Sequence, residues 1–282
     1  MDFKTFGSTG ISVPEIGQGT WDIPESGARC DAAQSAIRRG IELQMTHLDT
    51  AEMYGSGRVE EIVGEALAGI ERSRLFIASK VLPGNASYEG TIAACERSLE
   101  RLRIAYFDAY LLHWPGSYPL EDTMRALEYL VESGKARCIG VSNFDVDDVK
   151  QAQACLRRVP LACNQVLYNL GERGIESRLI PYCSSQNIAV VAYTPFGRGG
   201  TGQGARAGGD VLAKIARKHA KTPRQVTLRF LTREKHVFTI PKASTQPHVE
   251  ENAGASGWSL DPDDVADIDA AFPRRDGPLA TL

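Results

Sequence analysis

Short apolar runs alternate with longer amphipathic segments along most of this chain. The short runs have the length and composition of buried strands, whereas the longer segments repeat apolar residues every three or four positions, as helices do. Strands are predicted at residues 16–21 (running into a glycine-containing loop), 47–49, 75–79, 107–112, 137–141, 162–166, 188–193 and 237–240. Helices are predicted at residues 28–43, 59–67, 90–102, 120–133, 145–156, 175–186, 211–219, 223–232, 247–255 and 261–271.

This order of elements predicts the fold class. Eight strands, each followed by at least one helix, close most readily into a barrel when right-handed crossovers keep them parallel. The alternating segment 3–16 predicts a β-hairpin before the barrel. We therefore expect an α/β fold, a single (β/α)8 TIM barrel with an N-terminal β-hairpin and an extra C-terminal helix. Residues 1–282 are expected to form one domain, with an irregular tail from Pro273 to Leu282.

Local signals mark three of the helix ends. Gly134 follows the helix predicted at 120–133, and glycine is favoured just after a helix. Asp145 can cap the next helix, and Pro223 suits the first turn of a later one.

Composition narrows the classes of partner. The 282 residues are 43% hydrophobic and carry a formal net charge of −3, without a basic stripe, so no nucleic-acid partner is expected. No apolar run approaches the roughly 18 residues of a membrane span, and the N-terminus does not have the apolar core of a signal peptide. Six scattered cysteines without a CxxC pair predict free thiols in a reducing cytoplasm. The five histidines show no paired ligand spacing, so no metal is expected. We expect a cytoplasmic monomer.

Ionisable residues stand where three successive predicted strands end. Asp49 and Tyr54 follow the first of these strands, Lys80 the second and His113 the third. The carboxyl ends of barrel strands meet on one face, so these side chains are predicted to share a site. Singly, each has a structural explanation, as a cap, a surface aromatic, a solvated amine or a core imidazole. Their recurrence on consecutive strand ends favours a site.

These four groups suit proton transfer to a carbonyl oxygen. A phenol has a pKa of about 10, and a nearby ammonium is expected to lower the pKa of Tyr54. Asp49 would keep Lys80 charged and in place, and His113 could orient a carbonyl. Tyr54 could then protonate the carbonyl oxygen as a hydride reaches the carbon.

A glycine-rich segment, residues 197–202, matches GxGxxG after the seventh strand. A Rossmann fingerprint would instead occupy the first strand–helix turn of a doubly wound unit, with an acidic residue about 20 positions on. A flexible loop and a loop folded over a diphosphate both remain open.

An ordered set of motifs resembles the aldo-keto reductase family over nearly the whole chain. The motifs are Gly17–Trp21, Asp49–Tyr54, Ser79–Lys80, Leu111–Pro115, Gly140–Phe144, Asn164–Gln165, Ala192–Gly199 and Ile240–Ala243. The chain is most similar to short bacterial members that reduce methylglyoxal and similar small aldehydes.

The resemblance implies NADPH as cofactor, a small carbonyl compound as substrate and a role for each motif. Tyr54 would be the general acid, Lys80 and Asp49 its ion pair, and His113 the group that orients the carbonyl. The substrate pocket would be walled by Trp21, Met53, Tyr54, His113 and Trp114. Ser142, Asn143 and Gln165 would bind the nicotinamide carboxamide, Tyr193 would stack on its ring, and Thr194 to Gly199, with Pro195, Phe196 and Gly197, would wrap the pyrophosphate. Lys242 and Ser244 would hold the 2′-phosphate, and Glu251 and Asn252 would meet the adenine. Gly19, Thr20, Trp21, Asp49, Ile240, Ala243 and His248 would complete the cofactor-binding residues.

Two departures from the family pattern affect specificity. Many relatives have an arginine for the 2′-phosphate where this chain has His248, and imidazole does not offer the bidentate fork of guanidinium. NADPH preference should persist through Lys242, with NADH tolerated better than is usual. The brief tail after Pro273 predicts a more open substrate pocket than in relatives with a long final loop.

Two other functions compete with this interpretation. An NADP(H)-sensing binding protein would keep the same residues with little turnover. A barrel lyase or hydrolase would use Asp49 and Lys80, and Lys80 would form a Schiff base. The residues that the resemblance assigns to nicotinamide argue against the lyase.

Overall fold

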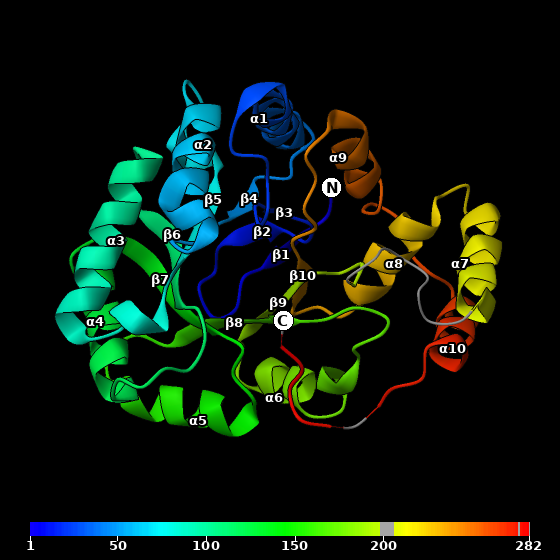
Figure 1. The fold of residues 1–282 in the computed structure, drawn as a ribbon. Coiled ribbons are helices and arrows are strands. Elements are labelled where there is room, and N and C mark those ends of the chain that lie inside the picture. The colour runs from blue at the N-terminus through cyan, green and yellow to red at the C-terminus, as the bar shows by residue number, and fades with distance from the viewer. Residues whose placement is uncertain (198–205, 276, 282) are drawn as a thin grey trace.

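Eight parallel strands form one curved sheet at the centre of the molecule (Figure 1). The computed structural model describes residues 1–197, 206–275 and 277–281, without the side chains of residues 206 and 207. The strands follow the order of the sequence from β3 to β10. Their bounds are β3 Gln18–Gly19, β4 His47–Asp49, β5 Phe76–Val81, β6 Phe107–Leu112, β7 Ala136–Ser142, β8 Leu161–Leu167, β9 Ala189–Tyr193 and β10 Val237–Thr239.

The first and last strands of this sheet meet and close it. Ile16 bridges Thr239 and Gly19 bridges Lys242, both in parallel register. A Cβ atom at Gly19 would lie 2.6 Å from the carbonyl oxygen of Ile240, so only glycine lets the two backbones approach this closely. The predicted (β/α)8 barrel is therefore confirmed.

Helices surround the barrel (Figure 1). The α-helices are α1 Gly27–Glu42, α2 Arg58–Leu67, α3 Tyr88–Leu102, α4 Leu120–Glu132, α5 Val146–Cys155, α6 Leu179–Ser185, α7 Arg206–Lys218, α8 Pro223–Leu231, α9 Gln246–Ala253 and α10 Pro262–Ala271. Short 3₁₀-helices occur at η1 Tyr54–Gly57, η2 Arg72–Arg74, η3 Pro83–Asn85 and η4 Gly174–Glu176. The three end signals are confirmed: Asp145 caps α5 in a capping box, Pro223 opens α8, and Gly134 follows α4 with φ of 73°.

Two predicted helices differ from the structure. The segment 175–186 is not continuous, because Arg178 leaves the helical conformation between η4 and α6. The helix predicted from residue 211 already begins at Arg206. Gly208 disfavours a helix locally, but it packs so closely on Phe272 that a Cβ atom would lie 2.5 Å from that ring. This contact between α7 and the segment after α10 overrides the local preference.

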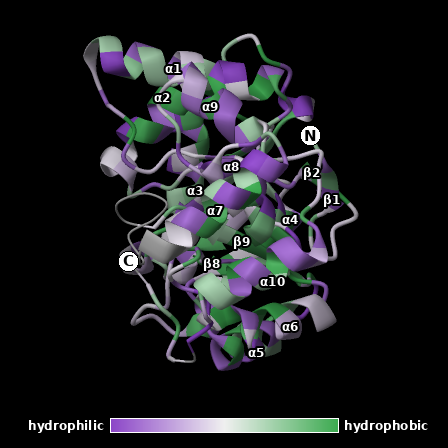
Figure 2. Cartoon of the chain, turned by 90° about the vertical axis from the view of Figure 1, so that its right-hand side faces the viewer, coloured by the Kyte–Doolittle hydropathy of each residue, from purple (hydrophilic) through white to green (hydrophobic). Residues whose placement is uncertain are grey.

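The N-terminal hairpin is confirmed and lies at one end of the barrel. Its strands are β1 Phe3–Thr5 and β2 Ser12–Pro14. Just after β1, the ring of Phe6 lies 4.6 Å from that of Phe76 and 5.2 Å from that of Phe238, so it seals the amino ends of the barrel strands. Figure 2 shows the hairpin at the opposite end from the chain's C-terminus. The carboxyl ends of the strands are therefore left for a site.

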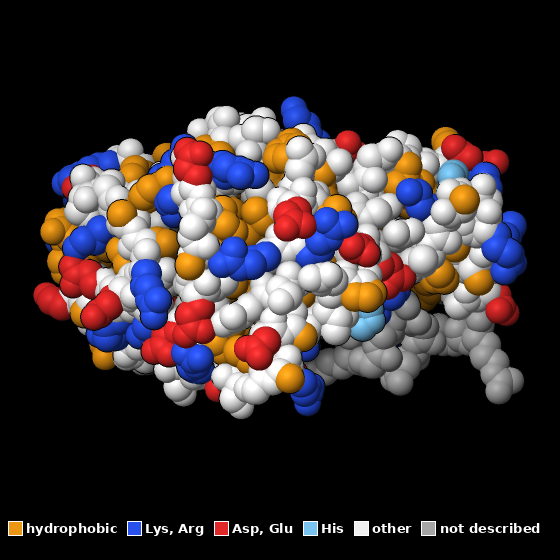
Figure 3. Space-filling view, turned by 90° about the horizontal axis from the view of Figure 1, so that it is seen from above, with side chains coloured by type: hydrophobic (Ala, Val, Ile, Leu, Met, Phe, Trp, Pro, Cys, Tyr) orange, Lys and Arg blue, Asp and Glu red, His pale blue; other side chains and the backbone are white. Residues whose placement is uncertain are grey.

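The surface and the thiols agree with the composition. Acidic and basic side chains are interspersed on the face that Figure 3 shows, over α1 and α9, so this face has no extended patch of one sign. All six cysteines are free, as predicted. None of the helices in the described part of the chain combines the length and apolarity needed to cross a membrane.

Candidate active site

Lys80 is the centre of a fully buried polar cluster at the end of β5. Its Nζ donates to Asp49 Oδ1 at 2.6 Å, to the carbonyl oxygen of Thr50 at 2.8 Å and to Tyr54 Oη at 3.2 Å. An ammonium has three donors, so all are used and the orientation of the group is fixed. Burial is the largest single influence and lowers the pKa of Lys80, but the charges of Asp49 and Tyr54 and their hydrogen bonds together outweigh it, so the pKa is raised. Lys80 is therefore a positioned cation.

Tyr54 is the first residue of η1 rather than part of a strand, and its hydroxyl points to Lys80. Lys80 lowers the pKa of Tyr54, as expected, but it does not decide the net direction. Burial raises the pKa of the phenol, Lys80 opposes this, and Asp49 raises it further, so the net direction is upward. The physical reason is that Asp49 neutralises the ammonium, and the pair cannot outweigh desolvation. Tyr54 is thus a protonated donor.

His113 follows β6 and faces Tyr54, with 5.9 Å between ring centroids. Burial, with a contribution from the charge of Lys80, lowers the pKa of His113 to about 2. Its ring is therefore a neutral imidazole at physiological pH, with one N–H donor. Its buried Nδ1 has no hydrogen-bond partner among the described residues.

Aromatic side chains border these polar groups. The ring centroid of Trp21 lies 5.0 Å from that of Tyr54, and the ring of Trp114 lies 4.7 Å from that of His113. Trp21 is 53% exposed and Trp114 36% exposed. Met53, next to Tyr54, is partly buried against the core. Exposed tryptophans beside a buried phenol form an apolar rim around a polar base.

The ends of β7, β8 and β9 add an amide cluster to the same face. Gln165 Nε2 donates to Asp49 Oδ2 at 2.6 Å, so Gln165 is joined directly to the Lys80 cluster. Asn143 Nδ2 donates to Ser142 Oγ and to the carbonyl oxygen of His113, both at 3.1 Å. Tyr193 Oη donates to Asn143 Oδ1 at 2.7 Å, which orients the Tyr193 ring. The residues predicted for the nicotinamide therefore lie together.

The chain leaves β9 through a tight turn. Thr194 and Gly197 both have positive φ, and the Gly197 N–H donates to the carbonyl oxygen of Thr194 at 3.0 Å. Pro195 and Phe196 form the middle of this turn. Gly199, predicted to bind cofactor, lies outside the described residues, as does most of the GxGxxG segment.

On the first strand, Thr20 hydrogen-bonds the backbone of the cluster. Its Oγ1 and N–H both donate to the carbonyl oxygen of Asp49, at 2.9 and 3.1 Å. Gly19 lies beside it at the barrel seam, opposite Ile240.

The residues predicted for the adenosine end surround the start of α9. Lys242 and His248 are exposed, and Ala243, Ser244 and Glu251 are partly buried. Asn252 is 1% exposed, yet neither of its amide atoms has a hydrogen-bond partner among the described residues, and the same is true of Ser244 Oγ. Buried polar groups are normally satisfied, so these atoms fit a polar ligand.

The ordered barrel and this site match a known family. The model of the Aldo/keto reductase family matches residues 15–272. The chain belongs to the aldo/keto reductase family. It is accordingly an oxidoreductase.

Several relatives of this reductase are named for an activity or were solved with a cofactor. It is 42% identical over 270 residues to the methylglyoxal reductase YeaE of Escherichia coli, covering 96% of this chain and 95% of the relative. It is 37% identical to the glyoxal reductase of Bacillus subtilis, covering 93% of this chain and 90% of the relative. An aldo/keto reductase from Klebsiella pneumoniae, solved in complex with NADP and acetate, is 38% identical with a TM-score of 0.91 and full coverage of both chains.

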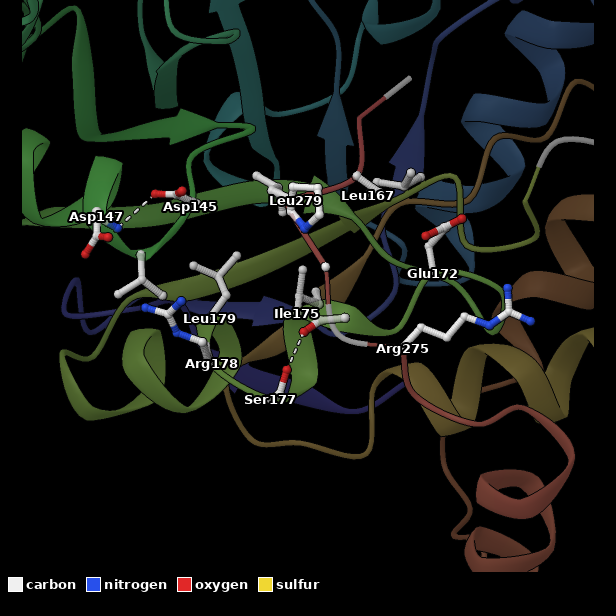
Figure 4. A pocket seen from close by; sticks show the side chains of 15 residues that line it. Asp145, Asp147, Leu167, Glu172, Ile175, Ser177, Arg178, Leu179, Arg275 and Leu279 are labelled. Atoms are coloured by element: carbon white, nitrogen blue, oxygen red, sulfur yellow. Dashed lines mark hydrogen bonds between the residues drawn. The ribbon is translucent and has the colours of Figure 1, made fainter.

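The tail of the reductase is irregular where it is described, and it returns to the carboxyl face of the barrel (Figures 1 and 2). Leu279 lines a cavity of about 560 Å³ with Leu167, the last residue of β8, and with Ile175 and Leu179 (Figure 4). The cavity adjoins the end of β8 and is lined by none of Asp49, Tyr54, Lys80 and His113. The more open substrate pocket stays a prediction.

One group of possible metal ligands lies elsewhere in the described part of the reductase. Ligand atoms of His219, Asp261 and Asp264 lie within 4.8 Å of one another, at α7 and α10. Lys218 Nζ, however, lies 2.8 Å from a carboxylate oxygen of each aspartate. This ammonium already pairs with both carboxylates, so the group is an ion-pair cluster.

Sequence reasoning missed two contributors to the site of the reductase. The carbonyl oxygen of Thr50 accepts from Lys80, but a backbone acceptor leaves no mark in residue identity. Arg224 places its guanidinium 3.7 Å from the ring centroid of Phe196. No local pattern signals that contact, because the two residues lie on different elements.

Proposed function

We propose that this reductase converts small aldehydes and reactive ketones, such as methylglyoxal, to alcohols with NADPH. The observation that carries the proposal is the single buried cluster of Asp49, Lys80 and Tyr54 facing the neutral ring of His113. The methylglyoxal and glyoxal reductases among its relatives support this substrate class.

Tyr54 acts as the general acid. NADPH, when bound, supplies a hydride to the carbonyl carbon. Tyr54 Oη accepts a hydrogen bond from Lys80, so its own O–H is free to point to the carbonyl oxygen. As this proton leaves, negative charge develops on the phenol oxygen 3.2 Å from the ammonium. Lys80 therefore stabilises the transition state although the resting phenol is a weak acid.

His113 orients the carbonyl. Its low pKa of about 2 keeps the imidazole neutral, so it can donate one hydrogen bond without competing as an acid. Trp21, Met53 and Trp114 would contact the apolar part of the substrate. An aromatic rim of this kind suits small, varied carbonyl compounds.

The residues on the carboxyl face fit NADP(H). Tyr193 is held by Asn143 so that its ring can stack on the nicotinamide, and Ser142, Asn143 and Gln165 supply amide and hydroxyl partners for the carboxamide. Glu251 and the unsatisfied amide of Asn252 match the donor and acceptor edge of adenine. Lys242 and Ser244 would bind the 2′-phosphate, and Thr194 to Gly197 would follow the pyrophosphate.

The expected single domain, monomeric state and cytoplasmic location stay predictions. The same is true of better use of NADH through His248. Size-exclusion chromatography with light scattering measures the oligomeric state directly.

A substrate panel on wild type and Tyr54→Phe tests the acid. With methylglyoxal, glyoxal and a nitrobenzaldehyde, NADPH oxidation should be rapid in wild type and fall about 10²- to 10⁴-fold in the variant, the usual contribution of a positioned acid. NADP⁺ affinity should be unchanged, because the variant keeps the ring. Tyr129→Phe, which alters an exposed phenol on α4, is the matched control. Retention of most activity in Tyr54→Phe would remove Tyr54 from this role.

The same panel separates the competing functions. Tight NADPH binding without turnover of any carbonyl would favour a cofactor-sensing protein. A lyase with a Schiff base at Lys80 requires a neutral, free amine, whereas Lys80 has all three donors engaged and a raised pKa. Borohydride trapping of substrate on Lys80 would nevertheless establish that chemistry.

A further inference from the structure

Arg224, the second residue of α8, joins two segments assigned to the cofactor. Its guanidinium carbon lies 3.7 Å from the ring centroid of Phe196, in the turn after β9. Its Nε lies 3.4 Å from Glu251 Oε2 on α9. By the proposed function, these segments meet the pyrophosphate and the adenine, so a permanent cation stands between them.

Within the described residues, Arg224 stacks on Phe196 and pairs with Glu251 without donating a hydrogen bond from its Nε. Its Nε is buried and has no hydrogen-bond partner among the described residues, so the contact with Glu251 is an ion pair without hydrogen-bond geometry. Arg229, one turn further along α8, differs: it donates from two nitrogens to Glu15, at 2.7 and 3.1 Å, and to the carbonyl oxygen of Thr232. Within the described residues, stacking and charge hold Arg224, which leaves hydrogen-bonding capacity for a ligand.

Unsatisfied polar groups occur on the neighbouring segments. Asn252, directly after Glu251, is 1% exposed and has no partner for either amide atom within the described ranges. Ser244 Oγ, just before α9, is buried and equally unpartnered there. By contrast His248, where many relatives have arginine, is exposed on α9. Arg224 therefore supplies a guanidinium from α8 beside Glu251.

We propose that Arg224 recognises the adenosine 2′-phosphate in this chain and replaces the guanidinium that many relatives have at position 248. The inference rests on the proposed use of NADP(H). Guanidinium is always charged and matches two phosphate oxygens at once, which a neutral imidazole cannot do. Phe196 stacks on one face of the Arg224 guanidinium, and Glu251 pairs with its Nε edge. The terminal nitrogens are therefore directed to the ligand. NADPH preference then comes from Arg224 together with Lys242, and the better use of NADH predicted from His248 is not expected.

Binding measurements test this without turnover. Dissociation constants for NADP⁺ and NAD⁺ are measured by tryptophan fluorescence on wild type, Arg224→Met, Arg224→Lys and His248→Ala. Met keeps much of the apolar stem on Phe196, and Lys keeps the charge without the fork. Arg224→Met should weaken NADP⁺ binding about 10- to 100-fold, the range of a charged hydrogen bond, and leave NAD⁺ binding nearly unchanged. Arg224→Lys should be intermediate, and His248→Ala should change little.

A matched control variant and two fragments of the cofactor make the test specific to the 2′-phosphate. Arg125→Met removes an arginine whose guanidinium lies 5.4 Å from the ring centroid of Tyr88, away from the site, and should leave both constants unchanged. Competition by 2′-AMP should weaken in Arg224→Met, and competition by 5′-AMP should not. Equal weakening of both fragments, or unchanged NADP⁺ binding in Arg224→Met, overturns the proposal. Failure of wild type to bind either dinucleotide would instead overturn the proposed function.

Discussion

At the scale of single residues, burial decides the protonation of the two histidines beside barrel strands. His47 on β4 is 1% exposed, and desolvation with a contribution from Lys80 lowers its pKa to about 3. His113 has a pKa of about 2 for the same reasons. Both are neutral in the folded protein at physiological pH. The unfolded chain, with histidine pKa values near 6.5, binds protons that the folded protein excludes.

The free energy of unfolding is therefore predicted to decrease as the pH is lowered, because these histidines take up protons in the unfolded state. Below about pH 6.5 the unfolded state gains protons, so the free energy of unfolding decreases as pH falls, by up to about 1.4 kcal/mol per pH unit for each histidine. Urea unfolding of wild type and His47→Asn between pH 4.5 and 7.5 measures this. The slope against pH should be shallower in the variant. Parallel slopes would show that His47 is not excluded from protonation.

At the scale of elements, two helical glycines have opposite roles. Gly64 on α2 faces the end of α3, where an added Cβ atom would lie 2.7 Å from the carbonyl oxygen of Leu102 and 3.0 Å from that of Arg101. Gly209 on α7 has no described atom within 4 Å of that position. Alanine is the better helix former by up to about 1 kcal/mol, so only the contact with α3 distinguishes the two sites.

The two alanine variants should change stability in opposite directions. Gly64→Ala pushes the backbones of α2 and α3 apart. It should lower the free energy of unfolding by about 1–3 kcal/mol, because overpacking outweighs helix propensity. Gly209→Ala should raise it by about 0.5–1 kcal/mol. Denaturant unfolding of both variants beside wild type measures the difference. A stabilised Gly64→Ala would mean that α2 and α3 separate easily.

At the scale of the whole molecule, one carboxylate ties the N-terminal hairpin, α8 and the segment after α9 to the barrel seam. Glu15, 0% exposed, accepts from Arg229 of α8 and from Ser256 after α9, and its Oε2 lies 3.1 Å from Lys4 Nζ. Its carbonyl oxygen accepts the N–H of Thr239 on β10. The N-terminal hairpin, the segment that leads into β3, and the strand β10 thus meet at one buried carboxylate.

Glu15→Ala should destabilise the entire barrel. It leaves the cations of Arg229 and Lys4 without their buried partner, a change that costs about 3–5 kcal/mol. Thermal unfolding should remain a single transition at lower temperature, because all strand pairs of the barrel depend on closure at this seam. Glu42→Ala, which removes an exposed partner of Arg39, is the control and should have little effect. An unchanged midpoint in Glu15→Ala would show that the seam closes without this charge.

The sequence by itself determined the order of strands and helices and the membership of the buried polar cluster. Periodicity is local, so apolar spacing was enough to predict the eight strands. Barrel geometry brings strand ends to one face, so Asp49, Lys80 and His113 could be grouped before their distances were known. Asp145 and Pro223 marked helix starts for equally local reasons.

Tertiary structure alone decided what depends on neighbours distant in sequence. Gly208 stays helical because of Phe272, and Gly19 is required because Ile240 crosses the seam. The pKa of Tyr54 rises because burial and Asp49 outweigh the ammonium expected to lower it. Arg224 reaches Phe196 and Glu251 only after the barrel has closed. Desolvation and contact depend on the surrounding packed atoms, and residue order does not specify these until the chain is folded.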